Sequence, residues 1–336
     1  MDIVTHGLAS LAIARGFFPR AGKAGTVAAV AAGVLADGDW ISVYFGPTAF
    51  LTWHRTCFHS LLSAIFFAAV LTIVLRPILK EMKEAQGTRL SAIFAASLCA
   101  ALVHVAMDAC QSSGVVLLWP FSSRRFALDW LPGLDPWILA ILIACIAVPE
   151  LLRLVSSEIG AKEKRPRGQT GAWIGLALLA LYVGVRGTLH SNVVAALESR
   201  TFHGEAARRA RAFPESLSLI TWHSVVETES ALDEIEVNAA ATSTLDADLG
   251  VQLFKPQSSP TLDKAQKTGV ARRFLAIAQI PKASVEKTEA GYLVVVRDLR
   301  YAASGETTHE IAALIELDFN NNVTSEELVW ARDLPH

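Results

Sequence analysis

The long apolar runs of this chain lie within residues 1–190, and they constrain the fold more than any other feature. A helix that crosses a bilayer needs roughly 20 mostly apolar residues. Four stretches meet this requirement: 58–79, 90–110, 135–154 and 171–189. Two shorter stretches, 3–18 and 24–39, are rich in small residues such as Gly and Ala, which favour close helix packing inside a bundle. The sequence therefore predicts a membrane all-α helical bundle of about six spans.

Over the whole chain only 18% of residues are charged and 52% are hydrophobic. Soluble domains usually carry about 25% charged residues, so the average composition indicates a membrane protein. Residues 191–336 depart from this average and resemble a soluble domain. Alternation and β-branched content predict strands at 216–228, 232–238, 284–288, 291–299, 308–318 and 323–331. A helix is expected at 262–278, and 205–213 is interpreted as a surface helix or linker. The prediction is a small α+β domain that follows the bundle.

Basic residues predict how the bundle is oriented, because Lys and Arg gather in cytoplasmic loops. Alternate predicted loops carry most of the basic residues of the first half. These are Arg15, Arg20, Lys23, Arg76, Lys80, Lys83, Arg89, Arg153, Lys162, Lys164, Arg165 and Arg167. Both termini and the α+β domain are therefore expected to be extracytoplasmic, in a multi-pass protein of a bacterial inner membrane.

Charge and cysteine usage argue against two kinds of site. The formal net charge of −2 shows no basic bias, so no nucleic-acid partner is expected. Four cysteines lie in the apolar half without a CxxC pair, which predicts neither a disulfide framework nor a thiolate metal site.

Ionisable residues occur in pairs within the apolar half. His104 and Asp108 lie four residues apart on one helix face, where they could bind one cation or form a buried hydrogen bond. Asp37 and Asp39 follow the second helix, either as a solvated Asp-Gly turn or as a metal ligand beside a general base.

Further histidines are predicted to reach the same membrane face. His54 and His59 flank the start of the third span, as ligands or as interfacial residues, and His6 is a ligand or a core histidine. With the residues above they make four His and three Asp, a donor set that suits one to three Zn²⁺ ions and could also take Mn²⁺. The remaining histidines are expected to be structural or exposed: His190, His203, His223, His309 and His336.

Arg124 and Arg125 form an adjacent basic pair on that same face. Guanidinium groups bind phosphate and carboxylate bidentately, so the pair could hold an anionic substrate beside a metal. Contact with lipid headgroups or pairing with Asp129 and Asp135 is the alternative interpretation.

Five motifs together resemble a known family. They are THG at 5–7, DGD at 37–39, HRTCFHSLL at 54–62, HVAMD at 104–108 and GVVLLWPFSSRRFALDW at 114–130. Their order resembles the YdjM-like family of inner-membrane-bound proteins classed as metal-dependent hydrolases, over about residues 1–155. That family is distantly similar to the superfamily of zinc-dependent phospholipase C and single-strand nucleases, which are all-helical phosphodiesterases.

The resemblance implies roles for individual residues. It implies metal ligands at His6, Asp39, His54, His59, His104 and Asp108, with Asp37 as a ligand or catalytic base. The chain departs from the family pattern at three places. Ala36 and Trp40 replace a proline and a histidine, Thr56-Cys57-Phe58 replaces Gly-x-Thr, and Gln111 stands where a threonine is expected.

The leading hypothesis is a membrane-bound metal-dependent hydrolase with its site at the extracytoplasmic membrane face. Asp37 would activate water, while Arg55, Arg124 and Arg125 would bind a phosphoester or lipid-linked substrate. The alternative is a non-catalytic membrane scaffold with a structural metal cluster, and the α+β domain could recruit a protein partner. A transporter ranks lowest, because it would need a polar site at a broken helix near the midplane.

Overall fold

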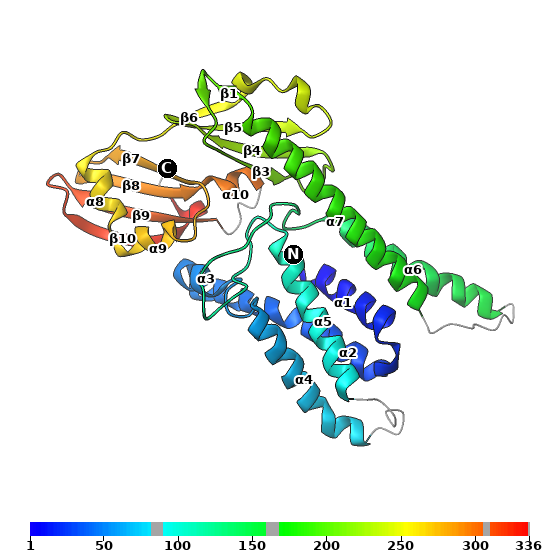
Figure 1. Cartoon of the computed structure of the whole chain (residues 1–336). Helices are drawn as coiled ribbons and strands as arrows, with labels where there is room; N and C mark the ends of the chain where they lie inside the picture. Colours follow the sequence, from blue (N-terminus) through cyan, green and yellow to red (C-terminus); the bar gives the residue numbers. More distant parts are fainter. Residues whose placement is uncertain (82–89, 159–167, 305–309, 335–336) are drawn as a thin grey trace. The chain divides into compact units, whose positions relative to one another are not determined.

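Two units, each with its own core, divide the chain in the computed structural model, which describes residues 1–81, 90–158, 168–304 and 310–334 (Figure 1). The helical unit comprises Met1–Ile41 and Trp53–Gly187. The β unit comprises Ser42–Thr52 and Thr188–His336. Helix α7 contains residues of both units.

Apolar helices build the helical unit. In chain order they are α1 (Ile3–Phe17), η1 (Pro19–Ala21), α2 (Gly22–Leu35), the start of η2 (Ala36–Phe45), α4 (Leu61–Glu81), α5 (Leu90–Ala109), α6 (Pro136–Glu158) and the first part of α7 (Gln169–Glu198). Helices α2 and α5 lie at the centre, because both pack against α1 and α4 as well as against each other. This arrangement gathers the carboxyl-terminal ends of α2 and α5 around the amino-terminal half of α1.

Small residues let α1 and α2 approach closely. A Cβ atom at Gly33 would lie 1.7 Å from Ser10 Oγ and 2.8 Å from Ser10 Cβ, so a larger residue at this crossing would force Ser10 of α1 to shift. Alanines at zero or near-zero exposure fill the rest of the contact between α1, α2 and α5. The small residues noted in the sequence therefore pack helix against helix.

Side-chain caps fix where two of the helices begin. Asp2 accepts a hydrogen bond from Thr5 N at 2.9 Å at the start of α1. Asp135 accepts from the backbone of Trp137 and Ile138 at 3.0 and 3.1 Å, and thereby caps α6. In the sequence Asp135 was a candidate partner of Arg124 and Arg125, and in the structure it caps α6.

Three helical stretches of the described residues are long and apolar enough to cross a membrane: Pro19–Phe45, Leu90–Ala109 and Gln169–Glu198. Ile3–Phe17, Leu61–Pro77 and Pro136–Leu152 are apolar but shorter. All six predicted spans thus coincide with apolar helices, while the count of six crossings is not confirmed.

The β unit contains antiparallel sheets and short helices. Its elements are α3 (Pro47–Trp53), β1 (Thr201–Phe202), β2 (Glu205–Ala206), β3 (Arg209–Pro214), β4 (Thr221–Glu227), β5 (Ala231–Asn238), η4 (Thr242–Thr244), η5 (Ala247–Leu249), β6 (Val251–Phe254), α8 (Pro260–Gln266), α9 (Gly269–Leu275), β7 (Pro281–Lys287), β8 (Gly291–Asp298), α10 (Leu299–Ser304), β9 (Ile311–Asp318), β10 (Val323–Trp330) and η7 (Ala331–Asp333). One four-stranded sheet has the order β3-β4-β5-β6 and the other β10-β9-β8-β7. Helices α8 and α9 pack against strands of the second sheet (Figure 1).

Segment Ser42–Thr52 belongs to the β unit although it lies within the helical half of the sequence. Phe50 of α3 is 6% exposed and packs in the core of the second sheet, with its ring centroid 5.5 Å from that of Trp330. The chain therefore leaves the helical unit after Ile41 and returns to it at Trp53.

The strand predictions in the β unit are confirmed in kind, and two local predictions are wrong. Residues 205–213 form β2 and most of β3 rather than a surface helix or linker, because Ala210 and Ala212 alternate with arginines as in a half-buried strand. The helix expected at 262–278 is two helices, since Thr268 accepts from Ala271 N and starts a new one. Strand β6 and helix α10 were not predicted.

Some sequence predictions fall outside the described residues. They concern the loop residues Lys83, Arg89, Lys162, Lys164, Arg165 and Arg167, and the histidines His309 and His336.

Replacement of Phe50 tests whether the inserted segment stabilises the β unit. Phe50→Ala should lower the free energy of unfolding of the β unit by about 3 kcal/mol, because a buried aromatic ring leaves a cavity. Pulse proteolysis of the detergent-solubilised chain in urea would measure this loss. Tyr44→Ala is the matched control, since Tyr44 lies in the same segment and is 85% exposed. Equal unfolding of both variants and the wild type would show that the segment adds nothing to the core.

Candidate metal centre

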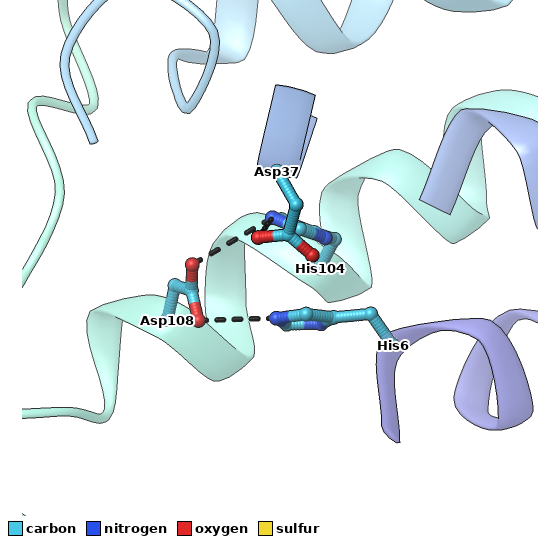
Figure 2. A group of neighbouring side chains, drawn as sticks. All are labelled: His6, Asp37, His104 and Asp108. Carbon is cyan, nitrogen blue, oxygen red and sulfur yellow. Dashed lines mark hydrogen bonds and ion pairs between the residues drawn. The ribbon is translucent and has the colours of Figure 1, made fainter. Parts of the chain in front are cut away.

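Four side chains from three parts of the helical unit converge at one buried point (Figure 2). His6 comes from the first turns of α1, Asp37 from the start of η2, and His104 and Asp108 from the last turns of α5. One potential ligand atom from each lies within 4.8 Å of the others, and all four residues are buried. The predicted convergence of these residues is thus present in the fold.

Hydrogen bonds orient the two stacked imidazoles of this group. His104 Nδ1 lies 2.7 Å from the carbonyl oxygen of Gly33, so Nδ1 carries the proton and Nε2 keeps a lone pair. His6 Nε2 lies 3.1 Å from Asp108 Oδ1, and the ring centroids of His6 and His104 are 3.7 Å apart. The close crossing at Gly33 therefore also sets the tautomer of His104.

His59 lies beside the same group. Its Nε2 is 3.1 Å from Asp108 Oδ2 and 3.9 Å from Asp37 Oδ1, and the side chain is fully buried. His59 thus contacts two carboxylates of this group, and its role as a ligand stays a prediction.

Asp39 and His54 do not belong to the four clustered donors. Asp39 contacts both His54 and His59. Asp39 Oδ1 is 3.0 Å from His54 Nδ1, and Asp39 Oδ2 is 3.0 Å from His59 Nδ1. Burial lowers the pKa of His54 to about 4, so its ring is neutral at pH 7. For His59, burial lowers the pKa, but the adjacent carboxylates of Asp108 and Asp39 outweigh it and raise the pKa overall. Asp39 thus orients two histidines, the role that outer carboxylates have at metal sites.

Arg55 is buried at the edge of the centre. Its guanidinium Nη2 donates to Gln111 Oε1 at 2.6 Å and lies 3.6 Å from Asp108 Oδ1. Its backbone has φ +56°, which costs a non-glycine residue roughly 1–2 kcal/mol. The backbone N–H of Arg55 donates to Asp39 Oδ2 at 2.7 Å, and its carbonyl accepts from Val116 N at 3.2 Å. These bonds hold the unusual conformation.

Gln111 belongs to the centre, and sequence reasoning did not predict a role for it. It is 1% exposed, binds Arg55, and accepts from the amine of Met1 at 3.0 Å, while that amine also donates to Asp108. The one sequence signal was its position, where the family pattern has threonine.

Arg124 and Arg125 differ from each other. Arg125 donates to the carbonyl oxygens of Ser113, Gly114 and His54 at 3.3–3.4 Å, and so joins two loops. Arg124 is exposed and lies over the ring of Phe126 at 5.5 Å. Neither is among the side chains that contact Asp108.

The donor set fits a divalent cation. His104 Nε2 and Asp37 Oδ2 are buried and have no hydrogen-bond partner within the described part of the chain. Buried polar atoms are rarely left unpaired, and carboxylates inside an apolar helical unit are costly without compensation. Two imidazoles and two carboxylates are common ligands of Zn²⁺.

Comparison with known proteins identifies a family for the helical unit. The profile of the YdjM inner membrane protein family matches residues 1–193. The chain belongs to the YdjM inner membrane protein family. A second profile, for the YfhP C-terminal alpha/beta plait domain, matches residues 260–334. No curated protein matches the chain, and no solved structure does so.

Family membership and the three candidate spans give an inner-membrane location. The YdjM match covers the whole helical unit, including every residue of the candidate centre, and ends within α7. The YfhP match covers α8 to β10 and is separate from the centre.

The two aspartates of the ADGDW motif should respond differently to removal of their charge. Asp39→Asn should lower the thermal stability of the chelator-treated protein, by about 1.5–3 kcal/mol, since Asp39 accepts a charge-assisted hydrogen bond and orients two histidines. Asp37→Asn should not lower it, because Oδ2 of Asp37 is buried without a partner. Thermal denaturation of both variants in excess chelator makes the comparison. Equal destabilisation would contradict the separate roles.

Proposed function

We propose that this protein is a membrane-bound metal-dependent hydrolase with its centre at the extracytoplasmic membrane face. The observation that supports it best is the buried group of His6, Asp37, His104 and Asp108, with several lone pairs unpaired. These residues and His59 would hold one to three divalent ions, with Zn²⁺ favoured by the histidines and Mn²⁺ accepted by the carboxylates. The extracytoplasmic orientation rests on the distribution of Lys and Arg in the sequence.

A divalent ion bound here supplies activation of water and polarisation of a phosphoryl or acyl group. Asp37 has two roles open to it, because Oδ1 faces His104 and His59 while Oδ2 is unpaired. One oxygen can ligate while the other accepts the proton of the attacking water. His59 and His54 would be kept in orientation by Asp39, which would act as a positioning residue rather than as a ligand of the first ion.

Arg55 is the best candidate to bind the anionic group of a substrate. Its Nε and Nη1 are buried without a partner among the described residues, while Nη2 is anchored by Gln111. The Nε–H and Nη1–H groups of a guanidinium held in this way can each donate a hydrogen bond to an anionic group. Arg125 would act indirectly through the loop that carries His54, and Arg124 would meet the substrate or lipid headgroups at the surface. A phosphoester or lipid-linked substrate follows from this chemistry and from the membrane location.

Metal content is the first test of the proposal. Detergent-purified wild type should contain at least one equivalent of a divalent transition metal by elemental analysis, and His104→Ala should lose most of it, because a ligand is removed. His223→Ala is the matched control, since His223 lies on strand β4 of the other unit. Wild-type protein without metal after growth and purification in metal-supplemented conditions would refute the centre.

Activity is the second test. Wild type should hydrolyse phosphodiester or lipid-linked phosphate substrates, and Asp37→Asn should lower kcat by at least about 10²-fold while it keeps the fold. Arg55→Gln should mainly raise KM, because it removes a contact to the anionic group in the ground state and transition state alike. Stoichiometric metal without turnover of any phosphoester or acyl ester would favour the second candidate function.

That second candidate is a non-catalytic scaffold in which the metal joins helices. The observation in its favour is that the donors come from α1, η2 and α5, so one ion would crosslink the centre of the bundle. A structural metal predicts that chelation lowers the melting temperature in wild type but not in His104→Ala, with no turnover in either.

A further inference from the structure

Residues of both four-stranded sheets line a cleft in the β unit, and none of the residues that line it belongs to the candidate metal centre. Its volume is about 470 Å³, within the roughly 300–1,000 Å³ range of small-molecule sites. Its floor is apolar and comes from both sheets and from α8: Val225, Leu232, Leu262, Ile280 and Val296. All five of these side chains are buried, so the floor belongs to the core of the unit.

Positive charge gathers at the rim of this cleft. Arg209, Arg211, Lys255 and Lys282 all line it, and among the described residues Glu227 is the one carboxylate that does so. The whole chain has a formal net charge of −2, so this concentration does not reflect a basic composition. The rim therefore carries an excess of positive charge over an apolar floor.

Strand β3 sets the two arginines in this position. Arg209 and Arg211 are two residues apart and point to the same face of the strand, while Ala210 and Ala212 are buried on the other face. Arg211 donates to Gln279 Oε1 across the cleft. Side chains held on one face of a strand form a more fixed pair than arginines on a loop.

The carboxylate at the rim is already engaged. Glu227 is the cross-strand neighbour of Arg209, but its Oε1 binds Lys255 Nζ at 2.8 Å. Lys255 Nζ also donates to the carbonyl oxygen of Thr228 at 2.7 Å. Within the described residues Arg209 has no ion-pair partner, so its guanidinium can take an external anion.

We propose that this cleft binds a single-chain alkyl phosphate, with the phosphate between Arg209 and Arg211 and the alkyl chain on the apolar floor. Guanidinium groups pair bidentately with phosphate oxygens, which explains the two arginines. The floor explains why an organic phosphate should bind better than phosphate alone, because each buried methylene adds up to about four-fold in affinity. The same chemistry occurs in a lysophospholipid head and in a soluble phosphorylated alcohol. This site is independent of the proposed hydrolase activity.

Equilibrium dialysis of the full chain in an uncharged detergent, with empty micelles as the blank, tests the proposal. The probes are hexyl phosphate, inorganic phosphate and hexyltrimethylammonium. Wild type should bind hexyl phosphate at least about ten-fold more tightly than inorganic phosphate, and should not bind the cation. Arg209→Gln/Arg211→Gln should lose at least about ten-fold of the hexyl phosphate affinity.

Arg208→Gln is the matched control, because Arg208 precedes Arg209 but pairs with Glu229 at 3.1 Å and does not line the cleft. It should bind hexyl phosphate like wild type, and all variants should keep the wild-type metal content. Equal hexyl phosphate affinity in the wild type and the double variant would overturn the proposal. So would inorganic phosphate binding as tightly as hexyl phosphate, which would mean that the floor takes no part. If hexyl phosphate binds and lysophosphatidic acid competes with it, the natural ligand is a lipid. If hexyl phosphate binds and lysophosphatidic acid does not compete with it, the natural ligand is a soluble phosphorylated alcohol.

Discussion

The burial of Asp108 is the constraint on which the helical unit depends. Its side chain has no exposed surface inside an apolar helix, and a charge in that environment is costly unless other groups compensate it. His6 and His59 each lie 3.1 Å from one of its oxygens, and Arg55 lies 3.6 Å away. Residues from α1, from the loop before α4 and from α5 must therefore meet at one point, whatever else the bundle does.

Small residues make that meeting possible. Gly33 allows α1 to approach α2 closely, and the same residue supplies the carbonyl oxygen that binds His104 Nδ1. A larger residue at position 33 would force Ser10 to shift on α1, which carries His6, and would disturb the partner of His104 at the same time. The packing of the bundle and the orientation of the donors thus depend on one crossing.

Sequence reasoning was strongest where periodicity and motif order carry information. Apolar runs identified the long helices that the described residues form in the helical unit, and the spacing of His104 and Asp108 identified a shared helix face. The different roles of Asp37 and Asp39 were not predictable from the sequence. A spacing of two residues does not reveal which carboxylate joins the clustered donors and which accepts a hydrogen bond from Arg55 N. The short strands β3 and β6 were missed, since Ala210 and Ala212 give a weak apolar signal beside three arginines. The position of α3 in the β unit depends on tertiary packing of Phe50, which no local pattern encodes.

Because Ser42–Thr52 belongs to the β unit, the interactions of Asp39 connect the residues before this segment to the residues after it. The chain leaves the helical unit directly after the two aspartates and returns to it just before His54. Asp39 binds His54 Nδ1 at 3.0 Å and Arg55 N at 2.7 Å, so it ties together the two ends of the excursion. These contacts fix the position of His54 and Arg55 relative to the aspartates that precede the excursion. A preorganised metal centre requires such support from the residues around its donors.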